Sequence, residues 1–352
     1  MKAAVLFGKG DLRPAEWEEP EAGRGEVKVR VHACGVCGSD IPRLIGDEAH
    51  FFPIILGHEF AGEVVAVGEG VENFTPGDRV ACAPLRPCGH CDDCQRGDYA
   101  LCRNYSFIGS REPGGFAEYV TIPATNAVKF SSAVTYEQGA LFEPSTVALH
   151  GLFCSDFRPG FDVAVLGTGN IGILAMQWAK ILGARRVAVF DILEERLELA
   201  KRLGADEVFL CGRDELLDEV KAFTGGKGFP YVFETAGQPA TIDLGFRLVG
   251  NKGRFTCIGN SHREVRFDPR TWELLNRKEF HLTGTWMSYS APFPGREWEM
   301  TAHYFGTGDL KLDDSMIFAR VPLERCGEII TMFSTPGAVR GKVLLTNETD
   351  VS

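Results

Sequence analysis

Residues 163–172 read VAVLGTGNIG, and this stretch decides the fold of the second half of the chain. An apolar run ends at Leu166, and a G-x-G-x-x-G pattern follows over Gly167–Gly172. A short apolar run is typical of a buried strand, and glycines at this spacing allow a tight turn into a helix. The stretch therefore predicts a strand, a close turn and a helix in direct succession.

Strand and helix patterns alternate on both sides of this stretch. Short apolar runs recur at regular intervals, and helical patterns such as residues 193–203 fill most of the gaps. This alternation predicts an α/β fold with a doubly wound parallel six-stranded sheet, a Rossmann domain. The expected strands are Val163–Leu166, Val187–Phe190, Val208–Leu210, Tyr231–Glu234, Arg254–Ile258 and His281–Gly284.

A glycine-rich turn in this setting indicates a dinucleotide cofactor. Its glycines permit close approach of the backbone, and the helix N-terminus favours a pyrophosphate. The residues expected to bind there are Gly167, Gly169, Asn170, Ile171 and Gly172. Asp191 follows the next strand, where a carboxylate binds ribose hydroxyls and repels a 2′-phosphate, so NAD is favoured over NADP. Asp191 could instead cap a helix.

Four further residues are weaker candidates for cofactor binding. Arg196 either covers the adenine or faces solvent. Because an arginine here could also pair with a 2′-phosphate, NADP stays an alternative cofactor. Ile258, Gly259 and Trp286 follow later strands, where the nicotinamide half is expected, but core and turn positions would explain them equally well.

The first half of the chain has a different pattern. Apolar residues alternate with polar ones over Val27–Val31, a second strand is expected over Gly62–Val67, and Gly and Pro break the region into short segments, as in an antiparallel β domain. Thr135 and Gln138 form a capping box for a short helix that Pro144 should interrupt, and a linking helix should continue over 146–153. We expect a discontinuous β-rich domain over 1–150 and 290–352, and a nucleotide domain over 151–289.

Four cysteines lie close together in the spacing C-x2-C-x2-C-x7-C. Thiolates at such short intervals can wrap one tetrahedral zinc, and four of them leave no open position, so the site would be structural. A redox or iron–sulfur cluster and a zinc-ribbon nucleic-acid module are the alternatives. The ligands are Cys88, Cys91, Cys94 and Cys102.

A second set of metal-ligating residues is scattered along the chain. Cys37, the pair His58-Glu59 and the distant Glu143 offer sulfur, nitrogen and oxygen donors, and a mixed set with an exchangeable position suits a catalytic zinc. Taken singly, each of these residues is ordinary. Cys34 and Cys37 could also form a C-x-x-C redox pair, although no thioredoxin-like helix is expected there.

The residues around His58 carry a longer motif. Gly57-His58-Glu59-Phe60-Ala61-Gly62, followed by Gly68 and Val71, resembles the signature of the zinc-containing medium-chain alcohol dehydrogenases. Both cysteine segments and the glycine-rich turn follow the order of that family along essentially the whole chain. The resemblance implies a GroES-like catalytic domain, a Rossmann domain, two zinc ions per chain, and NAD.

The resemblance also implies roles for single residues. Cys37, His58 and Glu59 look like catalytic zinc ligands, and Glu143 like a fourth, exchangeable ligand or the carboxylate that holds a zinc-bound water. Asp40 looks like the group that orients His58, and Ser39 like the hydroxyl that relays the substrate proton. Pro42 stands where some relatives carry a histidine, so the onward proton path departs from theirs.

The glutamates at 59 and 143 resemble those of polyol dehydrogenases, and several segments resemble the galactitol-1-phosphate 5-dehydrogenase branch. This implies oxidation of galactitol 1-phosphate to tagatose 6-phosphate. The alternatives are an unphosphorylated polyol such as sorbitol or iditol, and L-threonine. Candidate phosphate ligands are Arg43, Arg111 and Arg296. The matching segments are Cys37–Arg43, Phe107–Arg111, Gly114–Tyr119, Trp286–Ser290, Pro294–Glu299 and Gly341–Leu345.

Charge and composition set limits on other functions. The 352 residues carry a formal net charge of −11, which argues against a general nucleic-acid binder. The first residues lack a signal-peptide pattern, and the apolar segment 163–182 is broken by glycines, so we expect a cytoplasmic protein with no membrane partner. The family resemblance implies a homodimer or homotetramer. A non-catalytic zinc- and nucleotide-binding scaffold or sensor is the alternative outside the enzymes.

Overall fold

The computed structural model describes residues 1–347, and the chain divides into two compact units. The first unit is made of Met1–Glu143 and the segment that begins at Tyr289, and the second unit is Pro144–Ser288. Each unit has its own sheet and its own apolar core. The second unit is therefore inserted into the sequence of the first.

The second unit contains a six-stranded parallel sheet in the order β13-β12-β11-β14-β15-β16. This is the strand order 3-2-1-4-5-6 of a Rossmann domain, with β11 and β14 side by side where the order reverses. The expected fold class is confirmed. The strands are β11 (Asp162–Leu166), β12 (Arg186–Asp191), β13 (Glu207–Leu210), β14 (Phe229–Glu234), β15 (Val249–Cys257) and β16 (His281–Gly284).

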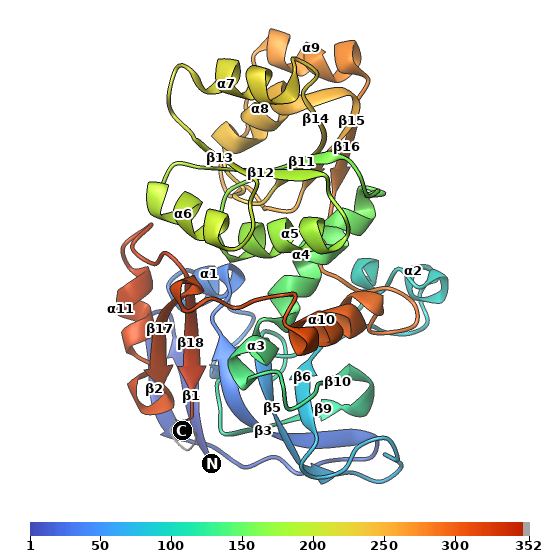
Figure 1. Ribbon diagram of the computed structural model, residues 1–352. Coiled ribbons are helices and arrows are strands. Elements are labelled where there is room, and N and C mark those ends of the chain that lie inside the picture. Colours follow the sequence, from blue (N-terminus) through green and yellow to red (C-terminus); the bar gives the residue numbers. More distant parts are fainter. Residues whose placement is uncertain (348–352) are drawn as a thin grey trace. The chain divides into compact units, whose positions relative to one another are not determined.

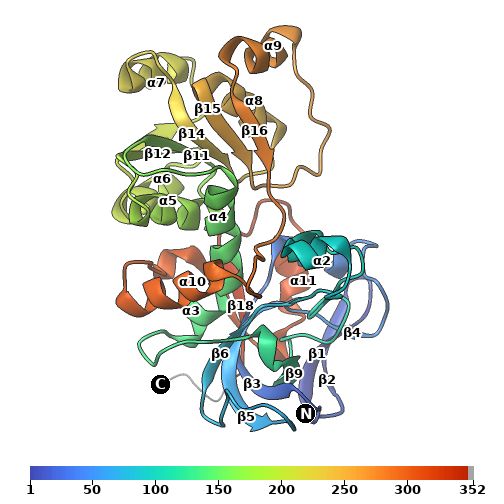
Figure 2. The ribbon, with the colours of Figure 1, turned by 90° about the vertical axis from the view of Figure 1, so that its right-hand side faces the viewer.

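Helices cover both faces of this sheet (Figure 1, Figure 2). In both views α5 and α6 lie on one face, and α8 and α9 lie on the other. The central strand β11 is buried along its whole length, which explains the uninterrupted apolar sequence of Val163–Leu166 after the paired Asp162. The helices of this unit are α4 (Phe142–Cys154, which begins in the first unit), α5 (Asn170–Ile181), α6 (Glu194–Arg202), α7 (Leu216–Thr224), α8 (Pro239–Leu248) and α9 (Pro269–Lys278).

The first unit is built around a mostly antiparallel sheet in the order β10-β6-β5-β3-β18-β17, with β9 also paired to β3 and a parallel pair β17-β18 at one edge. Figure 1 shows β17 and β18, from the end of the chain, beside the early strand β3. A smaller sheet, β2-β1-β4, and the pair β7-β8 complete the unit. The bounds are β1 (Lys2–Gly8), β2 (Asp11–Glu16), β3 (Glu26–Gly35), β4 (Ile54–Ile55), β5 (Glu59–Val67), β6 (Arg79–Cys82), β7 (Leu85–Arg86), β8 (Ser106–Phe107), β9 (Tyr119–Pro123), β10 (Ala127–Lys129), β17 (Ile317–Pro322) and β18 (Lys342–Thr346).

The helices of the first unit are short, apart from α10. They include the 3-10 turn η1 (Gly38–Asp40), which leads directly into α1. The other elements are α1 (Ile41–Leu44), α2 (Asp92–Arg96), η2 (Tyr99–Leu101), η3 (Ala124–Asn126), α3 (Tyr136–Ala140), α10 (Arg296–Thr307), η4 (Asp314–Met316), η5 (Leu323–Arg325) and α11 (Glu328–Phe333). None of the helices within residues 1–347 combines the length and apolar composition needed to cross a bilayer.

One local prediction was wrong. The capping box of Thr135 and Gln138 opens α3 as expected, but the helix break falls at Leu141, and α4 runs through Pro144. Pro144 is the third residue of α4, where the backbone N–H has no partner inside the helix. The proline therefore marks the start of this helix and does not interrupt it.

Candidate metal and dinucleotide sites

Three of the expected catalytic ligands come together in the first unit. The ligand atoms of Cys37, His58 and Glu59 lie within 4.8 Å of one another. Cys37 follows β3, His58 precedes β5 and Glu59 is its first residue. Strands β3 and β5 pair with Gly35 opposite Glu59, so the antiparallel register brings both segments to one place. Sulfur, nitrogen and oxygen donors at this separation form a suitable set for zinc.

Glycines beside this group leave room for its side chains. A Cβ at Gly35 would lie 2.2 Å from Glu59 Oε2. Gly57 has φ +95°, and a Cβ there would lie 2.4 Å from the Phe116 ring. Position 57 therefore requires glycine for two reasons: the backbone has a positive φ, and no space is left for a side chain.

Asp40 holds the segments around Cys37 and His58 in place. Its carboxylate is fully buried; Oδ2 accepts a hydrogen bond from the Cys37 backbone N–H at 3.0 Å, and Oδ1 lies 3.5 Å from His58 Nδ1. A carboxylate at this position can orient the imidazole ring, as a carboxylate behind a metal-binding histidine does. Burial opposes the charged imidazolium, but Asp40 and Cys37 outweigh it and raise the pKa of His58. Ser39 lies between Cys37 and Asp40, in η1.

Glu143 is half-buried and lies close enough to this group for its carboxyl to sense the charges of His58 and Glu59. Burial, and the nearby charge of Glu59, raise the pKa of its carboxyl to about 7, although the His58 charge acts in the opposite direction. Among residues 1–347, the ligand atoms of Cys37, His58 and Glu59 lie within 4.8 Å of one another, and Glu143 does not belong to this group. The role of Glu143 as a fourth ligand therefore stays a prediction.

Lys342 was missed by the sequence analysis. Its Nζ lies 2.5 Å from Glu59 Oε2 and 3.3 Å from the Val36 carbonyl oxygen, in a fully enclosed position. Burial disfavours the ammonium, but the nearby carboxylate of Glu59 outweighs it and raises the pKa of Lys342. No local pattern connects a lysine near the C-terminus with a glutamate at position 59, because the contact depends on the pairing of β18 with β3.

The second cysteine set also comes together. The sulfur of Cys88 lies 3.9 Å from that of Cys94, and the sulfur of Cys91 lies 4.0 Å from that of Cys102. A tetrahedron with Zn–S bonds of about 2.3 Å has S···S edges of about 3.8 Å, whereas a disulfide is about 2.05 Å long. All eleven cysteines lie within the described residues, and none forms a disulfide.

The thiols of this second set differ in acidity before any metal binds. Hydrogen bonds from the backbone N–H groups of Cys94 and Arg103 lower the pKa of Cys91 to about 6. Burial raises the pKa of Cys94 to about 12. Metal binding at these four residues would therefore release protons, since zinc binds thiolates.

The glycine-rich turn of the second unit has space for a ligand. Gly167 has φ +90°, and a Cβ at Gly172 would lie 1.9 Å from the Gly167 carbonyl oxygen, so both positions require glycine. Gly169 caps α5, and a Cβ there would meet no protein atom within 4 Å. The side-chain oxygen of Asn170 is buried without a hydrogen-bond partner in the described structure. Ile171 lies beside it in the first turn of α5.

Asp191 is the last residue of β12, and its side chain contacts the glycine-rich turn. Its Oδ2 accepts hydrogen bonds from the backbone N–H and the hydroxyl of Thr168, at 2.7 and 2.6 Å. The N-cap residue of α6 is Leu193, so the helix-cap explanation of Asp191 is wrong. Arg196 is buried, so the suggestion that it faces solvent is also wrong.

The remaining cofactor candidates occupy different environments. Ile258 is buried just after β15, and Gly259 follows it in a tightly packed loop. Trp286 is 47% exposed. The exposed side chain of Trp286 could cover a ligand. The side chain of Ile258 instead packs in the core.

Two of the three candidate arginines act on the same histidine. Arg43 donates a hydrogen bond to the Ser39 carbonyl oxygen, and Arg111 lies 4.3 Å from the centre of the Tyr105 ring. Burial, followed by the charges of Arg111 and Arg43, lowers the pKa of His50. Both guanidinium groups therefore lie near His50, which the sequence analysis missed. Arg296 is exposed at the start of α10.

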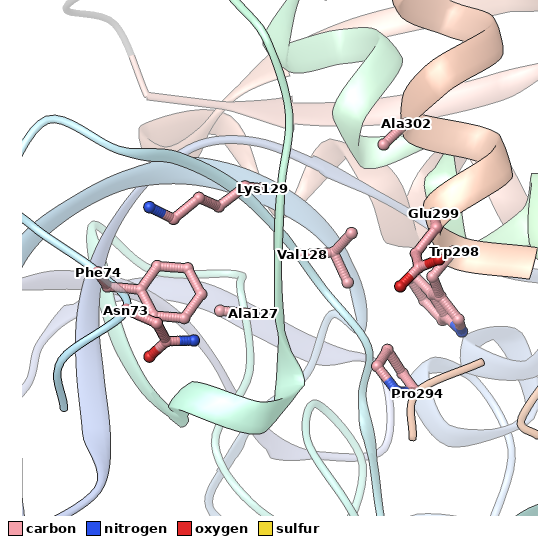
Figure 3. A pocket seen from close by; sticks show the side chains of 9 residues that line it. All are labelled: Asn73, Phe74, Ala127, Val128, Lys129, Pro294, Trp298, Glu299 and Ala302. Carbon is pink, nitrogen blue, oxygen red and sulfur yellow. The ribbon is translucent and has the colours of Figure 1, made fainter. Parts of the chain in front are cut away.

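Two open surface cavities lie away from these candidate sites. One of about 620 Å³ lies in the first unit, and Figure 3 shows Lys129 and Glu299 on opposite sides of it. The other, of about 750 Å³, lies between α6 and β13 in the second unit. Neither is lined by a candidate ligand of metal, cofactor or substrate. The residues lining the first are Asn73, Phe74, Ala127, Val128, Lys129, Pro294, Trp298, Glu299 and Ala302.

Comparison with known families agrees with this architecture. Residues 23–132 match the alcohol dehydrogenase GroES-like domain, and residues 170–302 match the zinc-binding dehydrogenase domain. The chain belongs to the zinc-type alcohol dehydrogenase family. It is therefore an oxidoreductase of the medium-chain dehydrogenase type, and the expected family and fold are confirmed.

Several curated relatives of this zinc-type dehydrogenase have named activities. Galactitol 1-phosphate 5-dehydrogenase of Escherichia coli K12 is 38% identical over 98% of this chain and 99% of its own length. A sorbitol dehydrogenase of Bacillus subtilis is 34% identical over 74% of this chain and 75% of its own. An L-threonine 3-dehydrogenase of Idiomarina loihiensis is 33% identical over 76% of this chain and 80% of its own.

Solved structures show the same similarity. Galactitol-1-phosphate dehydrogenase from Escherichia coli aligns with a TM-score of 0.92 at 38% identity, over 98% of this chain and all of that one. A zinc-binding dehydrogenase from Sinorhizobium meliloti 1021, bound to NADP, aligns with a TM-score of 0.87 at 32% identity, over 98% of each chain. A dehydrogenase from Escherichia coli CFT073, with NADH, gives 0.86 at 29% identity, over 98% of this chain and 99% of that one.

Proposed function

We propose that this zinc-type dehydrogenase oxidises a sugar-alcohol phosphate with NAD, and that galactitol 1-phosphate is converted to tagatose 6-phosphate. The observation that carries the proposal is the Cys37, His58 and Glu59 group, in a chain similar over almost its whole length to a galactitol 1-phosphate 5-dehydrogenase. The cationic residues near His50 support a phosphorylated substrate. We assign catalysis to residues 1–150 and 290–352, and NAD binding to 151–289.

In this proposal Cys37, His58 and Glu59 hold the catalytic zinc, and Glu143 is the exchangeable fourth ligand or holds a water at that ligand position. Zinc bound there supplies a Lewis acid for the alcohol oxygen, and NAD accepts the hydride. Asp40 keeps His58 in the orientation for binding. The Ser39 hydroxyl relays the proton that leaves the substrate hydroxyl, accepting it while giving up its own proton. That proton passes on to Glu143 or to water, because Pro42 offers no acceptor side chain.

Cys88, Cys91, Cys94 and Cys102 hold a second, structural zinc in this proposal. The S···S distances near 3.9 Å support four thiolate ligands around one ion. The surrounding segment is mostly polar, with short elements such as α2, so a metal provides the cross-link that a small apolar core cannot. The protein thus carries two zinc ions per chain.

We assign NAD as the cofactor because Asp191 follows the second strand of the Rossmann domain. Its carboxylate binds ribose hydroxyls and disfavours a 2′-phosphate. The buried, unpartnered oxygen of Asn170 and the open space at Gly169 support a ligand at the start of α5. The NADP-bound relative keeps NADP as the alternative to be tested.

Arg43 and Arg111 bind the substrate phosphate in this proposal. A guanidinium group forms two parallel hydrogen bonds with a phosphate, which gives both affinity and orientation. The Arg43 guanidinium lies 3.8 Å from Asp40 Oδ1, which brings it close to the proposed zinc ligands. Arg296 is a third candidate, although it is exposed at the start of α10.

The test is the rate of NADH formation from galactitol 1-phosphate, sorbitol and L-threonine in separate assays with the zinc-loaded protein. We expect the highest kcat/KM with galactitol 1-phosphate and with NAD in preference to NADP. A higher value with sorbitol or L-threonine would assign the protein to the activities of its other relatives. No turnover with any of them, together with retained zinc and NADH binding, would favour a scaffold or sensor.

We also propose a homodimer or homotetramer, which sedimentation velocity tests.

A further inference from the structure

The carboxyl end of β14 and the loop that follows it contact two other loops of the second unit through Glu234 and Thr235. These contacts lie at the carboxyl ends of β11, β14 and β15, where open α/β sheets bind their ligands. Neither residue stood out in the sequence, because neither belongs to the glycine-rich motif. Their contacts connect that motif to the rest of the sheet edge.

The first connection is made by the Thr235 side chain. Its hydroxyl donates to the Leu166 carbonyl oxygen at 2.9 Å and lies 3.1 Å from the Gly167 carbonyl oxygen. A Cβ at Gly172 would lie 2.8 Å from the same hydroxyl. The third glycine of the motif therefore makes room for Thr235, and the hydroxyl sits inside the turn that it holds.

The second connection is made by Glu234. Its fully buried carboxylate accepts hydrogen bonds from the backbone N–H groups of Ala236 and Gly237 at 2.9 Å, and from the Thr241 hydroxyl at 2.6 Å. Its backbone carbonyl oxygen accepts from Ile258 and Gly259 N–H groups. A single residue thus shapes its own loop and anchors the loop that follows β15.

The loops after β14 and β15 also touch directly. A Cβ at Gly259 would lie 2.4 Å from the backbone nitrogen of Gly237 and 2.9 Å from Glu234 Oε2. A Cβ at Gly237 would lie 2.3 Å from the Asn260 carbonyl oxygen. Such close packing transmits a displacement of one loop to the next, because no space is left to absorb it.

We propose that Thr235 and Glu234 are positioning residues that lock the glycine-rich turn onto the loops after β14 and β15, and so set the affinity for the dinucleotide. The proposal rests on the proposed binding of NAD by this unit. Neither residue needs to touch the cofactor, since each acts through the backbone of residues that do. A pre-organised turn loses less conformational entropy on binding than a mobile one.

The test combines amide hydrogen exchange with NADH titration on the zinc-loaded full chain. Thr235→Val keeps the shape of the side chain and removes the hydroxyl, whereas Thr235→Ser keeps the hydroxyl. Thr224→Val is the matched control, because its hydroxyl donates to the Val220 carbonyl oxygen at the end of α7. Without nucleotide, we expect faster exchange of amides 168–172 in Thr235→Val alone.

For NADH, measured by quenching of tryptophan fluorescence, we expect Thr235→Val to raise Kd about tenfold, the effect of losing one well-formed hydrogen bond. Thr235→Ser and Thr224→Val should stay within about twofold of wild type. KM for NAD should rise in Thr235→Val while kcat at saturating NAD changes little. Glu234→Gln should raise Kd for NADH more than Kd for ADP-ribose, since Glu234 anchors the loop after β15.

The outcomes separate this inference from the proposed function. Unchanged exchange of amides 168–172 in Thr235→Val, or an unchanged Kd, overturns the inference even if wild type binds NADH. A wild type that does not bind NADH overturns the cofactor assignment, and with it the claim about affinity. If Thr235→Val does not fold, Thr235→Ala and Glu234→Gln provide the same comparison, and wild-type affinity in both contradicts the positioning role.

Discussion

Lys342 Nζ lies 2.5 Å from Glu59 Oε2, and both side chains are enclosed in the first unit, at 7% and 1% exposure. The two residues are 283 positions apart in the sequence. The ion pair therefore engages a carboxylate that also belongs to the Cys37, His58 and Glu59 group. Charge balance at the candidate metal site therefore depends on a residue outside the ligand motif.

Lys342→Met should lower the free energy of unfolding of the metal-free protein by about 3–5 kcal/mol, because it leaves a buried carboxylate without its partner. The loss should be smaller with zinc bound, since the metal then compensates Glu59. Urea unfolding with and without a chelator measures both values. Lys9→Met is the matched control, because Lys9 forms an exposed pair with Asp47, and it should change stability by less than about 1 kcal/mol. An equal loss in both metal states would contradict the coupling.

The two candidate zinc sites should be separable. Cys37→Ser should lose one zinc and all measurable turnover while remaining folded, whereas Cys94→Ser should lose the other zinc and a large part of the thermal stability. Metal analysis by mass spectrometry, together with Tm, checks this. Cys154→Ser is the control, since Cys154 belongs to neither group, and it should keep two zinc ions. A wild type with fewer than two zinc ions per chain would refute the assignment.

Asp162 should make stability depend on pH at the acid end. Burial tends to raise its pKa, but hydrogen bonds and charges from Arg185 and Arg186 outweigh this and lower the pKa to about 2. The folded-state pKa lies below the unfolded value, so the stabilisation is present above about pH 4 and is lost as the pH falls toward about 2.

Asp162→Asn should therefore lower the free energy of unfolding by about 2 kcal/mol at neutral pH. The difference from wild type should shrink progressively below about pH 4. Asp243→Asn, which breaks a more exposed pair with Arg247, should cost less than about 1 kcal/mol. Chemical denaturation across this pH range gives the comparison, and a difference independent of pH would exclude the ionic origin.

The arginines proposed to bind phosphate should distinguish phosphorylated from plain polyols. Arg43→Ala and Arg111→Ala should each lower kcat/KM for galactitol 1-phosphate by about 10- to 100-fold, the range for a lost charge-assisted hydrogen bond. Neither should lower kcat/KM for sorbitol by more than about threefold, and Arg296→Ala provides the third comparison. Steady-state kinetics on both substrates decides the question. Equal losses on both would show that these arginines support the site without binding phosphate.

Several features followed from the sequence by itself. The parallel six-stranded sheet of the second unit followed from alternating periodicity, because strand and helix patterns alternate regularly along this part of the sequence. The four-cysteine set and the glycine-rich turn were recognisable because each lies in a short segment with characteristic spacing, whereas the scattered set at Cys37, His58 and Glu59 was recognised through the family resemblance. The segment 163–172 thus forms β11 and the start of α5 as expected.

Only the tertiary structure decided the rest. Lys342 meets Glu59 because β18 pairs with β3, and β3 in turn pairs with β5, a relationship between distant segments that leaves no local pattern. The Thr235 contact with the glycine-rich turn depends in the same way on β14 lying beside β11. Local periodicity and spacing specify elements and motifs, whereas strand pairing brings together side chains that no spacing rule connects.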